Sequence, residues 1–397
     1  MRTLTRLLYT MMALTAAIAC GQSIVEPKDR AKFNDIFDNA KGERLNCGIK
    51  TFGPYVDFGF RFELGYMVDC DIRQFDGVSG DVRIFLRVRP ENGDEVVLSD
   101  RIFFPGITKQ QRESIDLPKI HANFQFSGAL AAGEGVYALD LLIFDNRERV
   151  YRHSWKAKAE PHGKEAKVDF SMRPDAIAAL RTIPIPARPS VTKGTHLTVL
   201  MNAAPINPWS SKLRAWDRTF LLDSLSTLLR QLSYDSVRVV AFNLEQQREI
   251  FRQDDFSQSD MHSLSHALRN LELGTVSYNT LQRKSGWAEL LLGLLHSEAQ
   301  AEQPSDAVVF LGPTLRLEDK VPPELLASYQ QETPPLFCVA YYPRVGADFP
   351  DSIQHLTSAL KGKVFRIHTP GELAKNLDKL KHEIANDGAA RTTRAAK

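Results

Sequence analysis

Apolar and polar residues alternate through the first half of the chain. Every second residue from Phe58 to Tyr66 is a phenylalanine, leucine or tyrosine. Later runs with the same alternation span residues 82–88, 136–144 and 150–157. A period of two predicts strands with one buried face, and Asn-Gly and Asp-Gly turns lie between some of the runs. Short strands at this spacing are typical of an antiparallel β-sandwich of immunoglobulin-like kind. We expect it at residues 45–172, after a short helix over residues 29–40.

The pattern changes near residue 180. Four prolines and little periodic signal over residues 173–195 predict a stiff linker. Over residues 196–385, short apolar runs alternate with stretches in which apolar residues recur every three or four positions. This alternation predicts a second domain of the doubly wound α/β class, with a mostly parallel sheet and helices on both faces. The tail at residues 386–397 is small and polar, so we expect it to be disordered.

The elements expected in the second domain follow a regular order. A helix that starts at Asp217 places Leu221, Leu225, Leu228 and Leu232 on one face. After a strand at residues 237–242, the chain is expected to fold back as a short antiparallel edge at residues 248–251. The other expected strands span residues 197–201, 307–311, 336–342 and 364–367. The other expected helices contain residues 261–271, 287–294, 323–329, 353–360 and 373–384.

In element order, residues 197–384 resemble a von Willebrand factor type A domain. Such a domain has a central strand, a helix, a strand with an antiparallel neighbour, two helices and then three strand–helix units. The resemblance covers about half the chain and rests on this order more than on motifs. A sandwich joined to such a domain is also similar to proteins found in exported bacterial sets.

The metal site of that family is degenerate in this sequence. The resemblance implies an Asp-x-Ser-x-Ser run after the first strand, a threonine between the middle helices and an aspartate after the fourth strand, which together hold Mg²⁺. Here Asn202 takes the first position, Ala204 and Ile206 replace the serines, and no aspartate follows the fourth strand. Only Thr275 matches a further ligand. One amide oxygen and one hydroxyl offer little to a strongly hydrated dication, so we expect no metal and no cofactor. Residual metal-dependent adhesion through Asn202 and Thr275 is the alternative.

The loops at the carboxyl ends of the strands are the expected binding surface, because ligands of open α/β sheets bind at that edge. Rigid aromatic side chains there would anchor a protein partner. The candidate binding residues are Asn202, Pro205, Trp209, Trp216 and Thr275. The alternative is that both tryptophans pack against the sandwich or against helix ends.

The first residues predict export. Arg2 and Arg6 precede a short apolar stretch, and a small-residue pattern ends at Ala19, as in a signal peptide over residues 1–19. Cys20 follows directly, at the place where a bacterial lipoprotein carries its lipid. Lipidation of Cys20 and plain cleavage remain open alternatives. The protein is expected to be periplasmic, anchored as a lipoprotein or secreted, with the membrane reached only through such an anchor.

Three further cysteines lie in the expected mature chain. Cys47 and Cys70 fall in the β-rich part, and an exported protein could join them as a disulfide. Free thiols are the alternative. Cys338 lies within an apolar run, which favours a buried, inert thiol.

The charge balance and the absence of common catalytic motifs argue against nucleic-acid binding and against several enzyme classes. Fifty basic and 48 acidic residues give a net charge of +2 without a basic stripe, so no nucleic-acid partner is expected. The chain has no G-x-S-x-G, H-E-x-x-H or phosphate-loop motif. His262 and His266 have the spacing of zinc ligands but no third ligand, and an exposed helix face explains them equally. We therefore expect a non-catalytic protein-binding or scaffold protein whose partner lies in the cell envelope or outside the cell. A cell-envelope hydrolase with a dispersed site, involving His262 or His266, is the alternative from another class.

Overall fold

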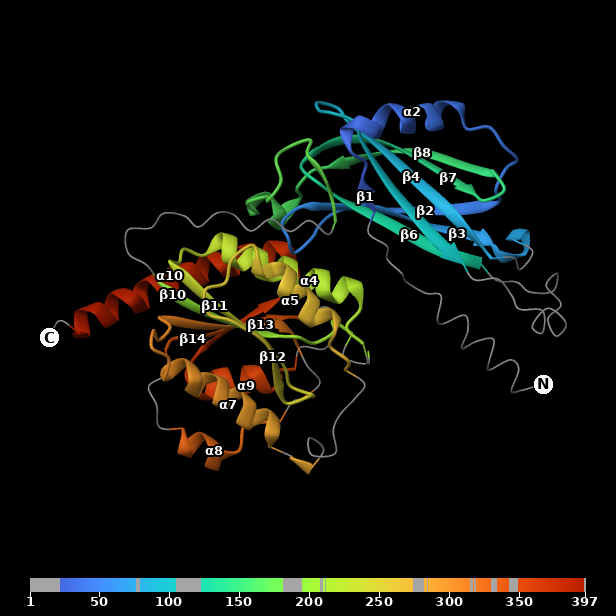
Figure 1. Ribbon diagram of the computed structural model, residues 1–397. Coiled ribbons are helices and arrows are strands. Elements are labelled where there is room, and N and C mark those ends of the chain that lie inside the picture. The colour runs from blue at the N-terminus through green and yellow to red at the C-terminus, as the bar shows by residue number, and fades with distance from the viewer. Residues whose placement is uncertain are drawn as a thin grey trace. The chain divides into compact units, whose positions relative to one another are not determined.

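The computed structural model divides the chain into two compact units (Figure 1). The first unit contains residues up to Gly163 and the segment Phe170–Thr182, and the second contains Lys164–Asp169 and the residues from Ile183 onward. The structure describes residues 22–75, 79–104, 123–180, 195–207, 210, 212–273, 282–283, 285–314, 317, 319–329, 334–342 and 349–395.

Two antiparallel sheets form the first unit. The four-stranded sheet has the order β2-β3-β6-β9, with strands Cys47–Val56, Phe62–Asp71, Asn123–Ala132 and Ile177–Ala179. The five-stranded sheet has the order β1-β5-β4-β7-β8, with strands Ser23–Ile24, Val96–Phe104, Gly80–Pro90, Gly135–Asp145 and Val150–Ala159. Short 3-10 helices lie at Pro27–Asp29, Ile72–Phe75 and Gly163–Lys167.

The alternation seen in the sequence defines the core between these sheets. Phe62, Leu64 and Tyr66 on β3 are almost fully buried and pack in one cluster with Ile84 and Leu86 on β4. Helix α2 (Arg30–Asn39), which the sequence predicted, covers the other face of the five-stranded sheet. The pattern of period two therefore correctly predicted a β-rich unit with two layers.

The linker predicted over residues 173–195 is wrong in its first part. Residues 177–179 form β9, which pairs antiparallel with β6. Ile177 also packs against the sandwich core. The ladder hydrogen bonds and this contact hold a strand too short to leave a periodic signal. The first unit therefore extends beyond residues 45–172 at both ends, since α2 and β9 belong to it.

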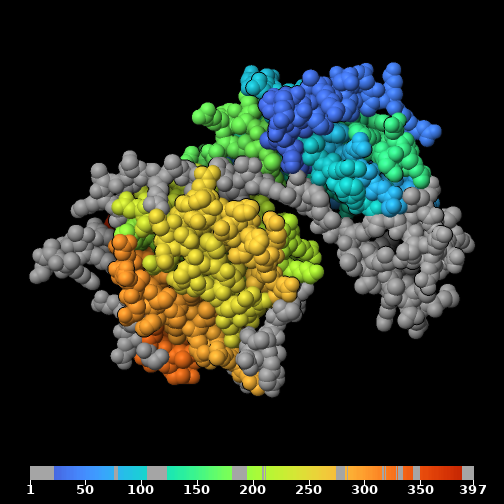
Figure 2. Space-filling model, in the orientation of Figure 1, coloured from blue at the N-terminus to red at the C-terminus, as the bar shows by residue number. Residues whose placement is uncertain are grey.

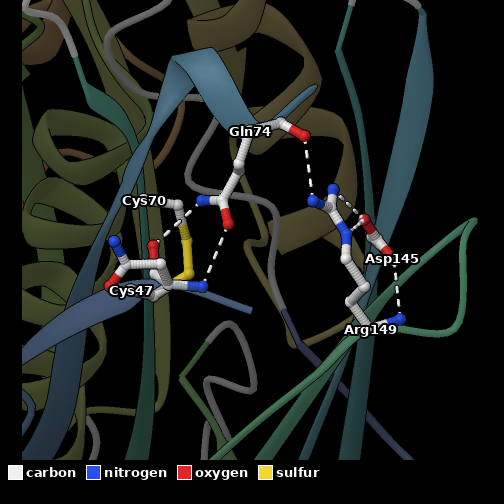
Figure 3. Close-up of a disulfide and its surroundings, with 6 residues drawn as sticks. Cys47, Cys70, Gln74, Asp145 and Arg149 are labelled. Atoms are coloured by element: carbon white, nitrogen blue, oxygen red, sulfur yellow. Dashed lines mark hydrogen bonds and ion pairs between the residues drawn. A yellow bond between two sulfur atoms is a disulfide. The ribbon is translucent and has the colours of Figure 1, made fainter. Parts of the chain in front are cut away.

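A disulfide between Cys47 and Cys70 joins β2 to β3, where the two cysteines are direct cross-strand partners (Figure 3). The side chain of Gln74 lies beside it and hydrogen-bonds both the backbone N–H and the carbonyl of Asn46, each at 2.9 Å. Arg149 donates to the carbonyl of Gln74 at 2.9 Å. Covalent and hydrogen bonds thus fix this end of the sandwich, and free thiols at these two positions do not occur.

A six-stranded sheet forms the centre of the second unit. Its order is β12-β11-β10-β13-β14-β15, with strands Arg248–Gln253, Ser236–Asn243, His196–Asn202, Ala307–Pro313, Leu336–Tyr341 and Lys363–Ile367. All neighbours run parallel except β12, which pairs antiparallel with β11 as expected. The edge strands are β12 and β15.

Helices cover both faces of this sheet (Figure 1). Helices α4 (Ala215–Gln231), α5 (Asp260–Arg269) and α10 (Pro370–Ala395) lie on one face, and α7 (Gly286–Ala299) and α9 (Ser352–Ala359) lie on the other. The short α8 spans Pro323–Ser328. The four leucines predicted on one face, three in α4 and Leu232 directly after it, are at most 3% exposed, and burying each contributes roughly 1.5–3 kcal/mol. The doubly wound α/β prediction is correct at this level.

The C-terminal tail differs from its prediction, and the environment of Cys338 agrees with its prediction. Helix α10 continues to Ala395, so residues 386–395 of the tail are helical where we expected disorder. Cys338 on β14 is 3% exposed, as predicted. Burial raises the pKa of its thiol well above the usual value, so it stays protonated and unreactive.

A buried carboxylate ties α7 to the sheet. Glu298 is fully buried and accepts hydrogen bonds from Thr198 Oγ1 at 2.7 Å, Arg238 Nη1 at 2.6 Å and Ser305 Oγ at 3.3 Å. Arg252 Nη1 lies 3.5 Å from its other oxygen. The network spans β10, β11, β12 and α7, so it links elements that are distant in sequence.

Candidate functional site

The predicted binding surface lies where β10, β13 and β14 end. We call it the carboxyl edge, and its described part comprises residues 202–207, 210, 212–220, 312–314 and 341–342. The chain leaves β10 at Asn202 and enters α4 at Ala215. The topology therefore brings the first loop of the sheet next to the first turn of α4, as in other open α/β sheets.

Asn202 is buried at this edge. It is 1% exposed, and its Nδ2 lies 3.5 Å from the carbonyl oxygen of Pro313. Its Oδ1 has no hydrogen-bond partner among the described residues. On the neighbouring strand, Gly312 has a φ of +155°, and a Cβ there would lie 2.9 Å from the carbonyl oxygen of Asn202. Only a glycine allows β13 to approach β10 so closely.

The described residues around Asn202 do not make up a magnesium site. Ala204 and Ile206, which stand where the resembled family has serines, are 2% and 8% exposed and present no oxygen side chain. Among the described residues, no group of three His, Cys, Asp or Glu side chains could hold a metal. Thr275 lies outside the described residues. One amide oxygen in apolar surroundings falls short of the six or more oxygens that a hard dication prefers.

Hydrogen bonds to buried side chains of α4 and β11 hold the loop that follows β10. The Asp217 carboxylate, 1% exposed, accepts the backbone N–H of Ile206 at 3.0 Å and that of Arg214 at 2.8 Å. Burial raises the pKa of Asp217, while the two N–H groups act in the opposite direction. Asn243 Nδ2 donates to the carbonyl of Ala203 at 2.8 Å. Side chains from α4 and β11 thus hold the backbone of this loop in one position.

Pro205 is also buried, contrary to its expected place on an accessible surface. The run of small and apolar residues from Ala203 to Ile206 folds inward, because the loop has almost no polar side chain to present to water. Asn202 and Pro205 therefore support the edge from inside. Neither is available to a partner in this structure.

Of the candidate residues that the structure describes, Trp216 is the accessible one. It is the second residue of α4 and is 49% exposed. One turn later, Phe220 packs edge-to-face on Tyr341 at the end of β14, with ring centroids 4.9 Å apart. The turn that presents Trp216 is therefore anchored to the sheet. Trp209, the other predicted anchor, lies outside the described residues.

The two histidines of α5 do not form a site. His262 and His266 are exposed on the helix, which lies at the surface of the face drawn in Figure 2 (yellow). The ring Nδ1 of His266 lies 3.1 Å from Nδ2 of Asn270. No third metal ligand joins them among the described residues. An exposed helix face accounts for both.

A polar cavity of about 330 Å³ lies at the opposite, amino edge of the sheet, where no sequence motif indicated a site. His196 and Ser236, neighbours at the starts of β10 and β11, line it, with His196 Nδ1 2.5 Å from Ser236 Oγ. Arg238 also lines it but is already paired with Asp254 at 2.5 Å and Glu298 at 2.6 Å. These residues come from separate segments, so only the strand order brings them together.

Comparison with known proteins identifies no family. No protein-family model and no curated protein matches the chain. Among solved structures, the reduced superoxide reductase (neelaredoxin) from Archaeoglobus fulgidus is 11% identical, covers 30% of this chain and 93% of its own, and has a TM-score of 0.21. A glycosyl hydrolase family 2 member from Bacteroides cellulosilyticus is 11% identical, covers 76% and 37%, and has a TM-score of 0.18. Likenesses at these scores carry no argument about fold family or activity.

Proposed function

We propose that this chain is an exported, non-catalytic binding or scaffold protein of the cell envelope. In this proposal an immunoglobulin-like sandwich precedes a metal-independent von Willebrand factor A-like domain, and that domain binds a protein partner at its carboxyl edge. The strand order β12-β11-β10-β13-β14-β15, with only β12 antiparallel, supports the resemblance in element order. The two antiparallel sheets of the first unit are compatible with an immunoglobulin-like sandwich.

Two features support export. The chain begins with the signal-peptide pattern, and the Cys47–Cys70 disulfide suits an oxidising compartment. None of the helices in the described part of the chain is both long and apolar enough to cross a membrane. Attachment through a lipid on Cys20 and release into the periplasm or medium are both compatible with the proposal.

The accessible Trp216 carries the binding part of the proposal. A large aromatic side chain with half its surface exposed stands on a turn that Asp217 and Phe220 fix to the fold. Binding energy in protein interfaces concentrates in such rigid aromatic anchors, since little conformational entropy is lost when they are covered.

Site-specific cross-linking tests this proposal. A photo-reactive amino acid replaces Trp216 in the full chain, expressed in cells that export it, and a matched sample carries it at Phe103, a 66% exposed aromatic residue of the first unit. We expect a discrete protein adduct from position 216 that position 103 does not give. The same adducts from both positions, or none from position 216, would refute the assignment of the carboxyl edge.

Residual metal-dependent adhesion is the second candidate, and one atom favours it. Asn202 Oδ1 is a buried oxygen without a hydrogen-bond partner among the described residues. Calorimetric titration of the full chain with Mg²⁺ and Mn²⁺ tests this candidate, with Asn202→Ala as the control. Heat that Asn202→Ala abolishes would support a metal site. Absence of heat would leave the metal-independent proposal.

A further inference from the structure

Positive charge surrounds Trp216 along the chain. Lys212 and Arg214 precede it and are exposed, and Arg218 follows it on α4. Neither the Lys212 nor the Arg214 side chain makes an ion pair with another described residue. Arg218 Nη1 turns back to the carbonyl of Leu213 at 2.8 Å, so its charge stays near the start of the helix.

Basic residues outnumber acidic ones in this part of the sequence. Between residues 203 and 222 the sequence has three basic residues and one acidic residue, Asp217, which leaves a local charge of +2. Asp217 is buried and engaged by the backbone N–H groups of Ile206 and Arg214. Its carboxylate also attracts Arg214 and Arg218 electrostatically, but it is buried while Lys212 and Arg214 are exposed, so the exposed charged groups next to Trp216 in the sequence are basic.

An exposed tryptophan next to exposed cations favours a partner that is both apolar and acidic. An exposed indole contributes when a large apolar side chain covers it. Guanidinium and ammonium groups attract carboxylates that come within about 8 Å of them, the screening length in physiological salt. Arginine can also bind a carboxylate through two parallel hydrogen bonds. A basic segment would be repelled, and a neutral one would gain nothing from the cations.

We infer that the carboxyl edge binds an acidic protein segment that places a large apolar side chain on Trp216 and carboxylates beside Lys212 and Arg214. This inference rests on the proposed function and adds the chemical class of the partner. Nucleic acid and anionic lipid would also be attracted by positive charge. Among the described residues of this edge, however, the exposed cations form a small cluster beside an apolar anchor, and the sequence has no extended basic stripe.

Fluorescence anisotropy with the full chain tests the inference. Three labelled peptides share a central Leu-Phe pair, flanked in turn by Asp and Glu, by Asn and Gln, or by Lys. We expect the acidic peptide to bind most tightly, and added salt to weaken its binding. Replacing both Lys212 and Arg214 by Gln should weaken it about five- to tenfold, the effect of two exposed ion pairs. The matched control replaces Lys375 and Lys379, exposed on α10, by Gln and should change nothing.

The variants separate failure of this inference from failure of the proposed function. Equal binding of the acidic and neutral peptides, lost in Trp216→Ala but kept in the Lys212→Gln, Arg214→Gln variant, would overturn the acidic class and leave the edge as a binding surface. Binding of no peptide, or binding that no variant at the edge changes, would overturn the inference. Phosphatidylglycerol vesicles that bind with the same dependence on Lys212 and Arg214, while the acidic peptide does not, would assign the surface to a lipid instead.

Discussion

The buried carboxylate of Glu298 gives the sharpest test of how the second unit is held together. Its two oxygens receive hydrogen bonds from strands β10, β11 and β12 and from the chain before β13, and no part of the side chain reaches water. The Glu298→Ala substitution removes the carboxylate and leaves Arg238, with 14% of its side chain exposed, facing a cavity.

The expected cost follows from this geometry. Removing one partner of a buried, hydrogen-bonded ion pair costs about 3–5 kcal/mol, because the remaining charge stays desolvated. Asp254 still pairs with Arg238 but is 70% exposed and compensates it only in part. We therefore expect Glu298→Ala to lower the free energy of unfolding of the second unit by about 3–4 kcal/mol. Glu298→Gln keeps the shape and one acceptor, so about 1.5–3 kcal/mol should be lost.

Native-state hydrogen exchange, read by mass spectrometry in urea, measures this loss separately in each unit. Peptides from β10, β11 and α7 should lose protection, while peptides from β3 and β6 of the sandwich serve as an internal control. In a double-mutant cycle, Arg238→Ala added to Glu298→Ala should cost much less than its effect alone. A loss below about 1 kcal/mol, the range of exposed pairs, or strict additivity of the two substitutions would refute the reasoning.

Three further predictions concern other parts of the molecule. Replacing Cys47 and Cys70 together by Ala opens a loop with a sequence separation of 23 residues and should cost the sandwich about 3 kcal/mol; an unchanged melting temperature would contradict this. A hydrogen bond from Arg101 holds the pKa of Asp81 below its usual value. The ionised Asp81 therefore stabilises the fold fully at pH values above its unfolded pKa of about 3.9. This contribution is lost as the pH falls through the lower folded pKa. Arg101→Gln should therefore raise the Asp81 pKa, as followed by carboxyl NMR, and flatten the acid dependence of stability; an unmoved pKa would contradict the pairing. Gly312→Ala should cost about 1–3 kcal/mol in thermal unfolding, because the new Cβ needs space that the β10 backbone occupies, whereas a neutral effect would mean that the two strands separate easily.

Most of the fold could be predicted because its signals are local. The leucine positions of α4 and the alternation along β3 each repeat over enough residues to define a buried face. Strand β9 could not be found in the same way. It has three residues in a proline-rich stretch, and pairing with β6 rather than any periodicity makes it a strand.

The candidate site was less predictable, since exposure depends on packing between distant segments. The sequence correctly indicated which loop follows the first strand. Treating the loop as one accessible surface did not separate the buried Asn202 and Pro205 from the exposed Trp216. The apolar character of residues 203–206 was the available signal, because a loop without polar side chains gains by folding inward. The amino-edge cavity had no signal at all, as it depends on the order of the strands.

The two edge strands of the six-stranded sheet affect how the molecule can associate. Strands β12 and β15 are short, and each has exposed cationic side chains, Arg248 on the first and Lys363 and Arg366 on the second. An incoming strand would have to desolvate these charges, of which Lys363 is paired with Glu383, and charged side chains on edge strands commonly oppose edge-to-edge aggregation. Under the proposed function, a partner would therefore contact side chains at the end of the sheet, where the strands finish, and would add no strand to it.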